Sequence, residues 1–458
     1  MIKFNKKYFN FLNLFLIFVF LLTAGFGCKN PGADVQEKLK PIEINYWRVF
    51  DNQDSFENII TQYKLIHPNI NIIYRKFRIE EYEQALLEAL AEDRGPDIFS
   101  INEADLRKYQ TKLEPMPVEI TMAYQYTKGT IKKEIVYELK TTKSLSLREL
   151  KANFADTVYN DVVLDGQIYG LPLSLETLVM FYNKDILNKA GIAQAPKNWK
   201  DFQEAVQKST KFDSTGKIIQ SGTALGTGDN IERSFDIISI LMMQNGAIMT
   251  DNNNYATFSN STGDKYFPGI EAIKFYLDFA SPVKSVYSWN TDMSNSFESF
   301  LSGKTAFMFG YNYHLPSIRS RAPKLNLGIA PIPQINQDNP INYANYWIEG
   351  VSKKSEHQNE AWDFVLFATN KDNIKSYLET TKRPTALKEL LSSQTDDEDL
   401  YPTSIQTLTA TNWYQGKNQA ATEEALKNMI EALPNALSDR DFSDIIKNTI
   451  TKINQTIQ

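Results

Sequence analysis

The chain contains few of the residues that make covalent cross-links or metal sites. Of its 458 residues only Cys28 is a cysteine, and only His67, His314 and His357 are histidines. A single cysteine excludes a disulfide within the chain, and the wide spacing of the histidines matches no zinc or redox motif, so no cofactor or metal is expected. The fold must be stabilised by core packing, and a chain of this length can form two or more units that each bury a core.

Basic residues are also in deficit. The sequence has 49 Lys and Arg against 55 Asp and Glu, a net charge of −6. Without Lys3, Lys6 and Lys7 the count is 46 against 55, or −9. An acidic chain disfavours a nucleic-acid partner and a basic grip on a membrane surface. Gly-x-Ser-x-Gly and phosphate-loop motifs are absent as well, so the sequence indicates binding and not catalysis.

The first 27 residues have the pattern of a secretory signal peptide. Three lysines precede an apolar run of eleven residues, Leu14 to Ala24 (LFLIFVFLLTA). A bilayer crossing needs roughly 20 apolar residues, so this run fits a signal-peptide core better than a transmembrane helix. We therefore predict export across the cell membrane, with residues 1–27 as the signal.

The signal ends in a motif that predicts a lipid anchor. Gly25-Phe26-Gly27-Cys28 resembles a bacterial lipobox, in which the cysteine is lipidated and becomes the new N-terminus. Gly27 fits that pattern, whereas Gly25 stands where Leu, Val or Ile is usual. We expect Cys28 to hold the protein on the extracytoplasmic face of the membrane and residues 28–40 to form a flexible tether. The alternatives are cleavage elsewhere and an uncleaved anchor.

The remaining chain begins with alternating strand and helix patterns. Strands are predicted at 42–47, 70–77 and 97–101, and helices at 55–66 and 80–92. This order implies right-handed crossovers and a parallel sheet, so the fold class is α/β. Further helices are predicted near 199–210, 233–245, 269–280, 295–302 and 356–368, several within 422–456, and one or two within 118–155.

Polar side chains follow two of the predicted strands. Trp47 and Arg48 come after the first strand, and Asn102, Glu103 and Asp105 come after the third. In parallel α/β sheets, ligands bind beyond the carboxyl ends of the strands, so these residues are candidates for a binding site. The alternative for Asn102 and Asp105 is that each caps the helix that follows.

Four ordered segments between about 40 and 370 resemble one protein family. They are GPDI (95–98); DGQIYGLPLSLETLVMFYNKDILNKAGI (165–192), which continues into PKNWKDF (196–202); FESFLSGKTAFMFGYN (297–312); and LGIAPIP (327–333), followed by EHQNEAWDFVLFAT (356–369). Together they resemble the extracellular solute-binding proteins of the maltose-binding-protein type, which feed ABC importers. Residues 118–155 and 385–410 match nothing in that pattern.

The resemblance implies two Rossmann-like lobes joined by a hinge of crossing strands, the type II periplasmic-binding-protein fold. It places the crossings near 172–178, 335–343 and 380–385. The first lobe would be 41–175 plus 340–382, and the second 176–339 plus 383–458. A ligand would bind in the cleft between the lobes, which close around it by a hinge motion. The permease subunits of the importer would then be the protein partner of a monomer.

A sugar is recognised by carboxylates, amides and arginine at its hydroxyls and by aromatic rings at its C–H faces. The family resemblance and the strand-end positions together select these candidate ligand-binding residues: Trp47, Asn102, Glu103, Glu176, Thr177, Asp229, Tyr311, Tyr346, Trp347, Glu349, Arg383 and Trp413. Alternative roles stay open for four of them: Glu176 and Arg383 could brace the hinge, Asp229 could cap a helix, and Trp347 could belong to a core.

The predicted function is capture of a small polar solute, a sugar or oligosaccharide, for an ABC importer. One rival is a secreted carbohydrate-active enzyme, which needs two carboxylates about 5 to 9.5 Å apart and could use Glu103 and Glu176. Another rival is a lipoprotein adhesin or sensor with a degenerate binding fold. The sequence does not identify the solute.

Overall fold

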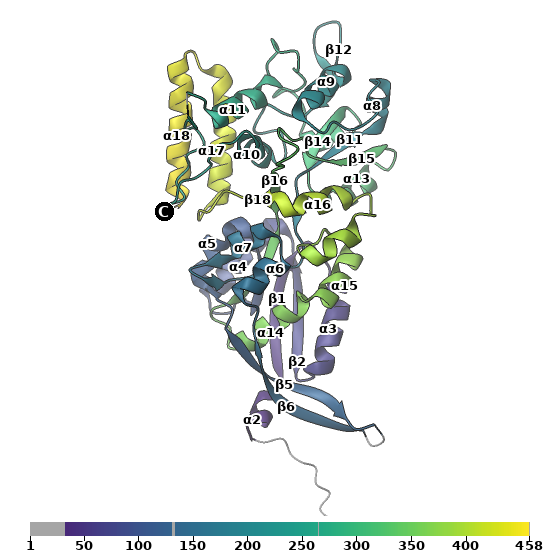
Figure 1. Cartoon of the computed structure of the whole chain (residues 1–458), viewed down its shortest axis with the longest axis vertical. Coiled ribbons are helices and arrows are strands. Elements are labelled where there is room, and N and C mark those ends of the chain that lie inside the picture. Colours follow the sequence, from purple (N-terminus) through teal and green to yellow (C-terminus); the bar gives the residue numbers. More distant parts are fainter. Residues whose placement is uncertain (1–32, 131–132, 264, 458) are drawn as a thin grey trace, which may run out of the picture.

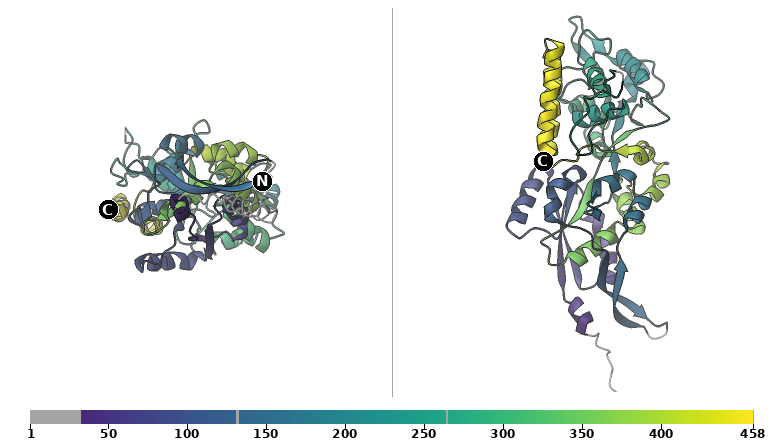
Figure 2. Two further views of the ribbon diagram at one scale, coloured as in Figure 1. Left: turned by 90° about the horizontal axis from the view of Figure 1, so that it is seen from below. Right: turned by 60° about the vertical axis from the view of Figure 1, so that its left-hand side comes forward.

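The computed structural model describes residues 33–130, 133–263 and 265–457 and shows two α/β bodies stacked along one long axis (Figures 1 and 2). The predicted signal peptide, residues 1–27, and the predicted lipidation site Cys28 lie outside the described residues. Every helix within these ranges is too short or too polar to cross a lipid bilayer.

The first body is built on a mixed sheet of order β2-β1-β3-β17-β4, with β9 also paired to β17. Its strands are β1 (Ile42–Val49), β2 (Ile70–Phe77), β3 (Ile98–Asn102), β4 (Leu113–Glu114), β9 (Leu171–Pro172) and β17 (Trp347–Ser352). β1 pairs in parallel with β2 and β3, as α3 (Asp54–Ile66) and α4 (Ile79–Ala91) provide the crossovers. The predicted parallel start of the fold is thus confirmed.

The second body contains a five-stranded sheet of order β12-β13-β14-β11-β15. Its strands are β11 (Val179–Asn183), β12 (Lys211–Phe212), β13 (Ile218–Thr223), β14 (Thr305–Gly310) and β15 (Leu327–Pro331). The helices of this body are α8 (Lys184–Lys189), α9 (Trp199–Ser209), α10 (Ser234–Gln244), α11 (Pro268–Asp278), α12 (Ser296–Leu301) and α13 (Leu315–Arg321), with α17 (Gln419–Ala432) and α18 (Asp439–Ile457) along its side. The helices predicted from apolar spacing in this region are present, with small shifts at their ends.

A small sheet joins the bodies. It consists of β10 (Glu176–Thr177), β16 (Asn342–Asn345) and β18 (Ala410–Thr411), and β16 is the central strand. Leu175 packs in the core of the first body and Leu178 in that of the second. On the return, Tyr343 packs in the core of the second body and Ala344 in that of the first. The chain therefore passes between the two cores at this sheet.

The packing differs from the prediction at the third crossing. We expected the chain to leave the first body near 380–385, after α14 (Gln358–Ala368) and α15 (Lys371–Thr381). Ala386, Leu387 and Leu390 are still buried in the first core, and α16 (Tyr401–Gln406) packs against β15 of the second. No family motif covers 385–410, so the sequence offered nothing to place the crossing.

The helices predicted within 118–155 are only partly correct. Residues 119–143 form a hairpin of β5 (Glu119–Lys128) and β6 (Glu134–Lys143). The α-helix of the segment is α6 (Leu147–Asn153), and α7 (Asp156–Val162) begins just after it. Ile120 and Met122 are buried on alternate positions of β5, which is the period of a strand. The high charge of the segment masked this short alternation.

The hairpin is attached to the far end of the first body (Figure 2). Buried His67 lies between the Ala123 carbonyl oxygen, 2.9 Å from Nδ1, and an Asp363 carboxylate oxygen, 3.2 Å from Nε2. Tyr63 donates to the same carboxylate at 2.9 Å. These contacts connect β5 to α3 and α14. The short helix α2 (Ala33–Lys38) contacts both strands of the hairpin.

Candidate ligand cleft

Two adjoining cavities lie where the bodies meet the joining sheet. One has a volume of about 50 Å³ and the other about 710 Å³, and both are lined by Phe50, Asp51, Glu176, Tyr313 and Arg383. The larger volume falls in the range of small-molecule sites. Since the lining comes from both bodies and from β10, a molecule bound here would touch every part that a hinge motion displaces.

Aromatic rings face the cleft from opposite sides. Phe50 and Trp347 belong to the first body, and their rings meet edge to face with centroids 5.4 Å apart. Tyr313 comes from the second body, just after β14. Phe50 is 43% exposed and Tyr313 41% exposed, although both are large and partly apolar. Exposed rings on both walls suit the flat C–H faces of a sugar.

Phe50 also has an unusual backbone. Its φ is +72°, in the left-handed region that non-glycine residues seldom occupy. Such conformations cost free energy and persist where the surrounding structure imposes them. Here the left-handed turn directs the chain from β1 into α3, and the Phe50 ring lies on the cavity wall.

Charged side chains connect the cleft to the joining sheet. Arg383 bridges Asp51 and Glu176, with nitrogen–oxygen distances of 3.0 Å to each. The second Glu176 oxygen accepts from the Tyr313 backbone N–H at 3.1 Å. Arg48 lies 3.3 Å from both Asp51 and Glu349. The network holds the end of β1, the joining strand β10 and the chain after β14 in one arrangement.

The two arginines control the ionisation of these acids. Burial works against a charged Asp51, yet Arg48 and Arg383 outweigh it and lower the pKa of that carboxyl below its usual value. Burial raises the pKa of Glu176, and Arg383 offsets only part of the effect. Burial likewise raises the pKa of Glu349 against the pull of Arg48. All three acids therefore depend on an arginine partner.

A second polar cluster closes the junction on another side. Tyr346 donates from its hydroxyl to Asp161 at 2.7 Å, and Asn412 donates to the same carboxylate at 2.9 Å. Glu103 accepts from the Tyr346 backbone N–H at 3.2 Å. Burial raises the pKa of Glu103, and neighbouring Asp161 raises it further. Burial raises the pKa of Asp161 to about 6, although its hydrogen bonds oppose the change.

This cluster predicts a pH-dependent stability. Asp161 ionises at a higher pH in the folded chain than in the unfolded one, so its contribution to the free energy of unfolding falls as pH rises from about 4 to about 6. We expect Asp161→Asn to gain stability relative to the wild type across that window, by at most about 3 kcal/mol, and then to level off. Chemical unfolding at several pH values measures the difference; a constant difference would contradict the prediction.

The structure brings several predicted residues to the cleft. Glu176, Tyr346, Trp347 and Arg383 line its smaller cavity, and Glu103 lies in the adjoining polar cluster. Glu349 lies beneath the cavity, where it accepts from Ser100 at 2.5 Å and pairs with Arg48.

Other predicted residues have different surroundings. Trp47 packs on Phe77 and Arg75 of β2. Asn102 caps the turn after β3 by accepting from the Ala104 N–H, which was the alternative considered for it. Thr177 is buried and accepts from Gln406.

Three further residues lie within or on the second body. The Asp229 side chain is exposed, and its backbone N–H donates to Glu431 of α17. Tyr311 is fully buried and donates to Asp236 at 2.7 Å. Trp413 is buried in the second core, where its ring nitrogen donates to Ser239 at 2.9 Å.

Sequence reasoning missed Phe50, Asp51, Asp161 and Asn412. The sequence predicted that the first strand ends at residue 47. In the structure β1 continues to Val49, so the residues beyond its carboxyl end are Phe50 and Asp51. The continuing apolar and basic alternation through Val49 was the available signal. Asp161 lies on a helix, and its position beside Asn412 follows only from tertiary packing.

The chain is similar to proteins of one bacterial family. A family model described as bacterial extracellular solute-binding protein matches residues 58–403. The maltodextrin-binding protein MdxE of Bacillus subtilis is 27% identical over 50% of this chain and 52% of its own length. The maltotriose-binding protein of Pyrococcus abyssi is 23% identical over 70% of this chain and 60% of its own. The chain thus spans about half, or slightly more, of the length of the relatives it matches.

Solved structures share the fold. The cyclic α-maltosyl-1,6-maltose binding protein from Arthrobacter globiformis has a TM-score of 0.71 at 18% identity, covering 91% of this chain and 99% of that one. A cyclo/maltodextrin-binding protein complexed with maltotetraose has a TM-score of 0.70 at 15% identity, covering 92% and 99%. These likenesses confirm the predicted α/β periplasmic-binding-protein fold.

Proposed function

The chain belongs to the bacterial extracellular solute-binding protein family, and from that premise we propose that it captures an oligosaccharide between its two bodies for delivery to an ABC importer. Proteins of this family bind solutes and do not catalyse reactions, so the chain is not an enzyme. The choice of a sugar is supported by the names of its relatives, which include binding proteins for maltodextrin, galactooligosaccharide and maltotriose.

The observation that carries the proposal is the composition of the cleft. Rings from both bodies, Phe50 and Trp347 on one side and Tyr313 on the other, line a space that also presents Asp51, Glu176 and Arg383. Stacking surfaces with polar groups between them are what a saccharide requires. The acids here are paired with arginine, which favours a ligand with no net charge. Of the predicted binding residues, we propose that Glu176, Tyr346, Trp347 and Arg383 contact the sugar.

A thermal-shift panel tests the proposal. A ligand that binds only the folded chain raises its melting temperature in proportion to ln(1 + [L]/Kd), so a true ligand acts in a concentration-dependent way. We expect a shift with at least one neutral oligosaccharide among maltotriose, maltotetraose, mannobiose and galactobiose, and none with sugar acids or peptides. A shift with peptides alone would overturn the choice of ligand class.

We further propose that the protein is anchored through Cys28 on the outer face of the cell membrane. The proposal is supported by the lipobox-like sequence before Cys28 and by the extracellular character of the family. Two acyl chains on one residue hold a protein on a bilayer far more firmly than one. Fractionation of cells that express the wild type or Cys28→Ser tests it. Equal membrane association of both proteins would contradict the anchor.

A further inference from the structure

The short helix α16 and the turn after it, Thr407–Thr409, have an inverted arrangement of side chains. The exposed positions are apolar: Tyr401 is 45% exposed, Ile405 45% and Leu408 56%. They are spaced i, i+4 and i+7 and so form one stripe. Apart from Pro402, the buried positions of the same segment are polar: Thr403, Ser404, Gln406 and Thr407. A surface helix normally buries its apolar face and exposes its polar face to solvent.

The polar face is turned inward because it holds the joining sheet. The Gln406 side-chain amide donates to the Thr177 hydroxyl at 2.8 Å and to the Leu178 carbonyl at 3.0 Å, and its oxygen accepts from the Ile332 N–H at 2.8 Å. Thr403 donates to Asn312 at 3.2 Å. These bonds fix the rotation of the helix, so the apolar stripe is held in water. An apolar stripe held in this position marks an interaction surface.

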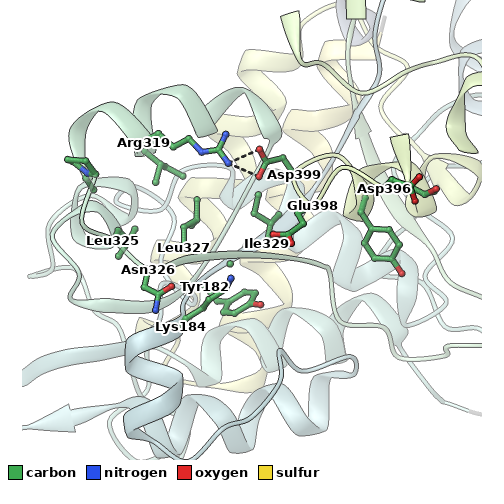
Figure 3. Close-up of a pocket in the computed structure, with 16 residues that line it drawn as sticks. Tyr182, Lys184, Arg319, Leu325, Asn326, Leu327, Ile329, Asp396, Glu398 and Asp399 are labelled. Atoms are coloured by element: carbon green, nitrogen blue, oxygen red, sulfur yellow. Dashed lines mark hydrogen bonds and ion pairs between the residues drawn. The ribbon is translucent and has the colours of Figure 1, made fainter. Parts of the chain in front are cut away.

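A groove begins beside the stripe (Figure 3). It has a volume of about 750 Å³ and runs between the end of α13, β15 and the loop 395–399, and Tyr401 forms part of its wall. Ile329 and Leu327 supply apolar surface within it. Asp396 and Glu398 line the loop side, and neither side chain makes an ion pair or hydrogen bond to any residue that the structure describes. Lys184, Asn326 and Arg319 line the groove as well, so it combines apolar and polar surface and presents two acids along one rim.

α16 lies at the junction of the two bodies (Figure 1), and the groove extends from it along α13 and β15 of the second body. The loop leads out of the first core after Leu390, and Asp399 is held to Arg319 of α13 by two bonds of 2.6 and 2.7 Å. α16 itself contacts β10 of the joining sheet and β15 of the second body. A molecule bound across the stripe and the groove would therefore contact a region whose shape depends on the angle between the bodies.

We propose that the stripe Tyr401-Ile405-Leu408 and the adjoining acidic groove are the surface on which this protein docks onto the membrane-embedded subunits of its importer. The inference rests on the proposed transport function. The occupant is a segment of a permease subunit that carries apolar side chains for the stripe and basic side chains for Asp396 and Glu398. A second copy of this chain fits less well, since the region beyond the signal lysines has a charge of −9 (46 basic against 55 acidic residues). Like charges at a shared interface oppose association.

Sugar uptake in cells lacking the native gene tests the docking surface. The test variant is Ile405→Ser/Leu408→Ser, and the matched control is Val283→Ser/Leu437→Ser, which changes apolar side chains that are 89% and 94% exposed elsewhere. The probe is radiolabelled maltotriose, or the panel sugar that binds most tightly. We expect uptake to fall about tenfold or more in the test variant and to stay at the wild-type rate in the control, because few interface residues carry most of the binding energy. Asp396→Asn/Glu398→Gln should reduce uptake less, and more strongly at low salt.

Binding and folding are measured on the same purified proteins. The proposal requires an unchanged sugar Kd and an unchanged melting temperature in the Ile405/Leu408 variant. Uptake equal to the wild type would overturn the docking surface while leaving the transport function intact. A weakened sugar Kd or a lost fold would overturn it too, since the stripe would then act inside the molecule. Failure of the wild-type gene to restore uptake of any panel sugar would instead overturn the transport function, and the docking proposal with it.

Discussion

Replacing Arg383 with methionine is expected to lower the free energy of unfolding by about 3 kcal/mol at neutral pH. Arg383 bridges Asp51 of the first body and Glu176 of the joining strand. Methionine keeps most of the volume but leaves the buried Glu176 carboxylate without its cation. An uncompensated buried charge costs far more than the intact pair contributes. Denaturant unfolding of both proteins at pH 7 measures the loss.

The pH dependence distinguishes a charge effect from a packing effect. Without Arg383 the pKa values of Asp51 and Glu176 rise in the folded variant. The folded variant therefore binds protons at pH values where the same acids are still ionised in the unfolded chain. Acidification from pH 7 to pH 5 should therefore reduce the difference in free energy of unfolding between the variant and the wild type. Adding Glu176→Gln to Arg383→Met should restore part of the stability at pH 7. An equal difference in free energy of unfolding at both pH values would show that the guanidinium contributes through packing alone.

Trp413→Ala is expected to destabilise the fold by about 3–5 kcal/mol, the usual cost of truncating a buried tryptophan. The indole is buried in the second core, is stacked near Phe235 with centroids 5.9 Å apart, and donates to the buried Ser239 hydroxyl. Truncation leaves both a cavity and an unpartnered hydroxyl. The sequence placed Trp413 among the candidate ligand-binding residues, where truncation would change the melting temperature little. Its burial in the second core predicts a large loss of stability instead.

Trp347→Ala is the matched control for that experiment. Trp347 is partly exposed and lines the cleft against Phe50. We expect its truncation to weaken binding of the panel sugar by tenfold or more with a small change in melting temperature, because stacking aromatics are frequent hot spots. Calorimetric titration and thermal unfolding of both variants give the comparison. If Trp347→Ala were the less stable of the two, the assignment of the two rings would be wrong.

The sequence was most informative where local patterns decide the structure. Alternating apolar periods placed β1, β2 and the helices between them, and the family-like segment around Glu176 placed a joining strand that the structure confirms. Arg383 could be named as a site or brace residue, and the structure gives it ion pairs on both sides. These successes depend on short-range periodicity and on ordered motifs, both of which are visible in one dimension.

The sequence was least informative where tertiary contacts decide the structure. Trp347 and Trp413 both sit beside polar residues in the chain, and only packing separates a wall residue from a core residue. The hairpin 119–143 carries many charges because much of it is exposed, which hid its strand period. The spacing of Tyr401, Ile405 and Leu408 does not say whether the stripe is buried or exposed, and the inward bonds made by Gln406 are what turn it outward.

If the protein is anchored through Cys28 as proposed, the hairpin determines which half of the molecule moves relative to the cell surface. α2 rests on β5 and β6, and only four residues lie between Cys28 and Ala33, so the five Cα-to-Cα steps span at most about 18 Å. With Cys28 anchored, the first body is held near the lipid headgroups, while the second body is attached only through the joining sheet until the protein docks on the importer. Each opening and closing would then be a swing of the second body against a nearly stationary partner, and a fluorescent label on α18 should report a far larger displacement from the bilayer than one on α3.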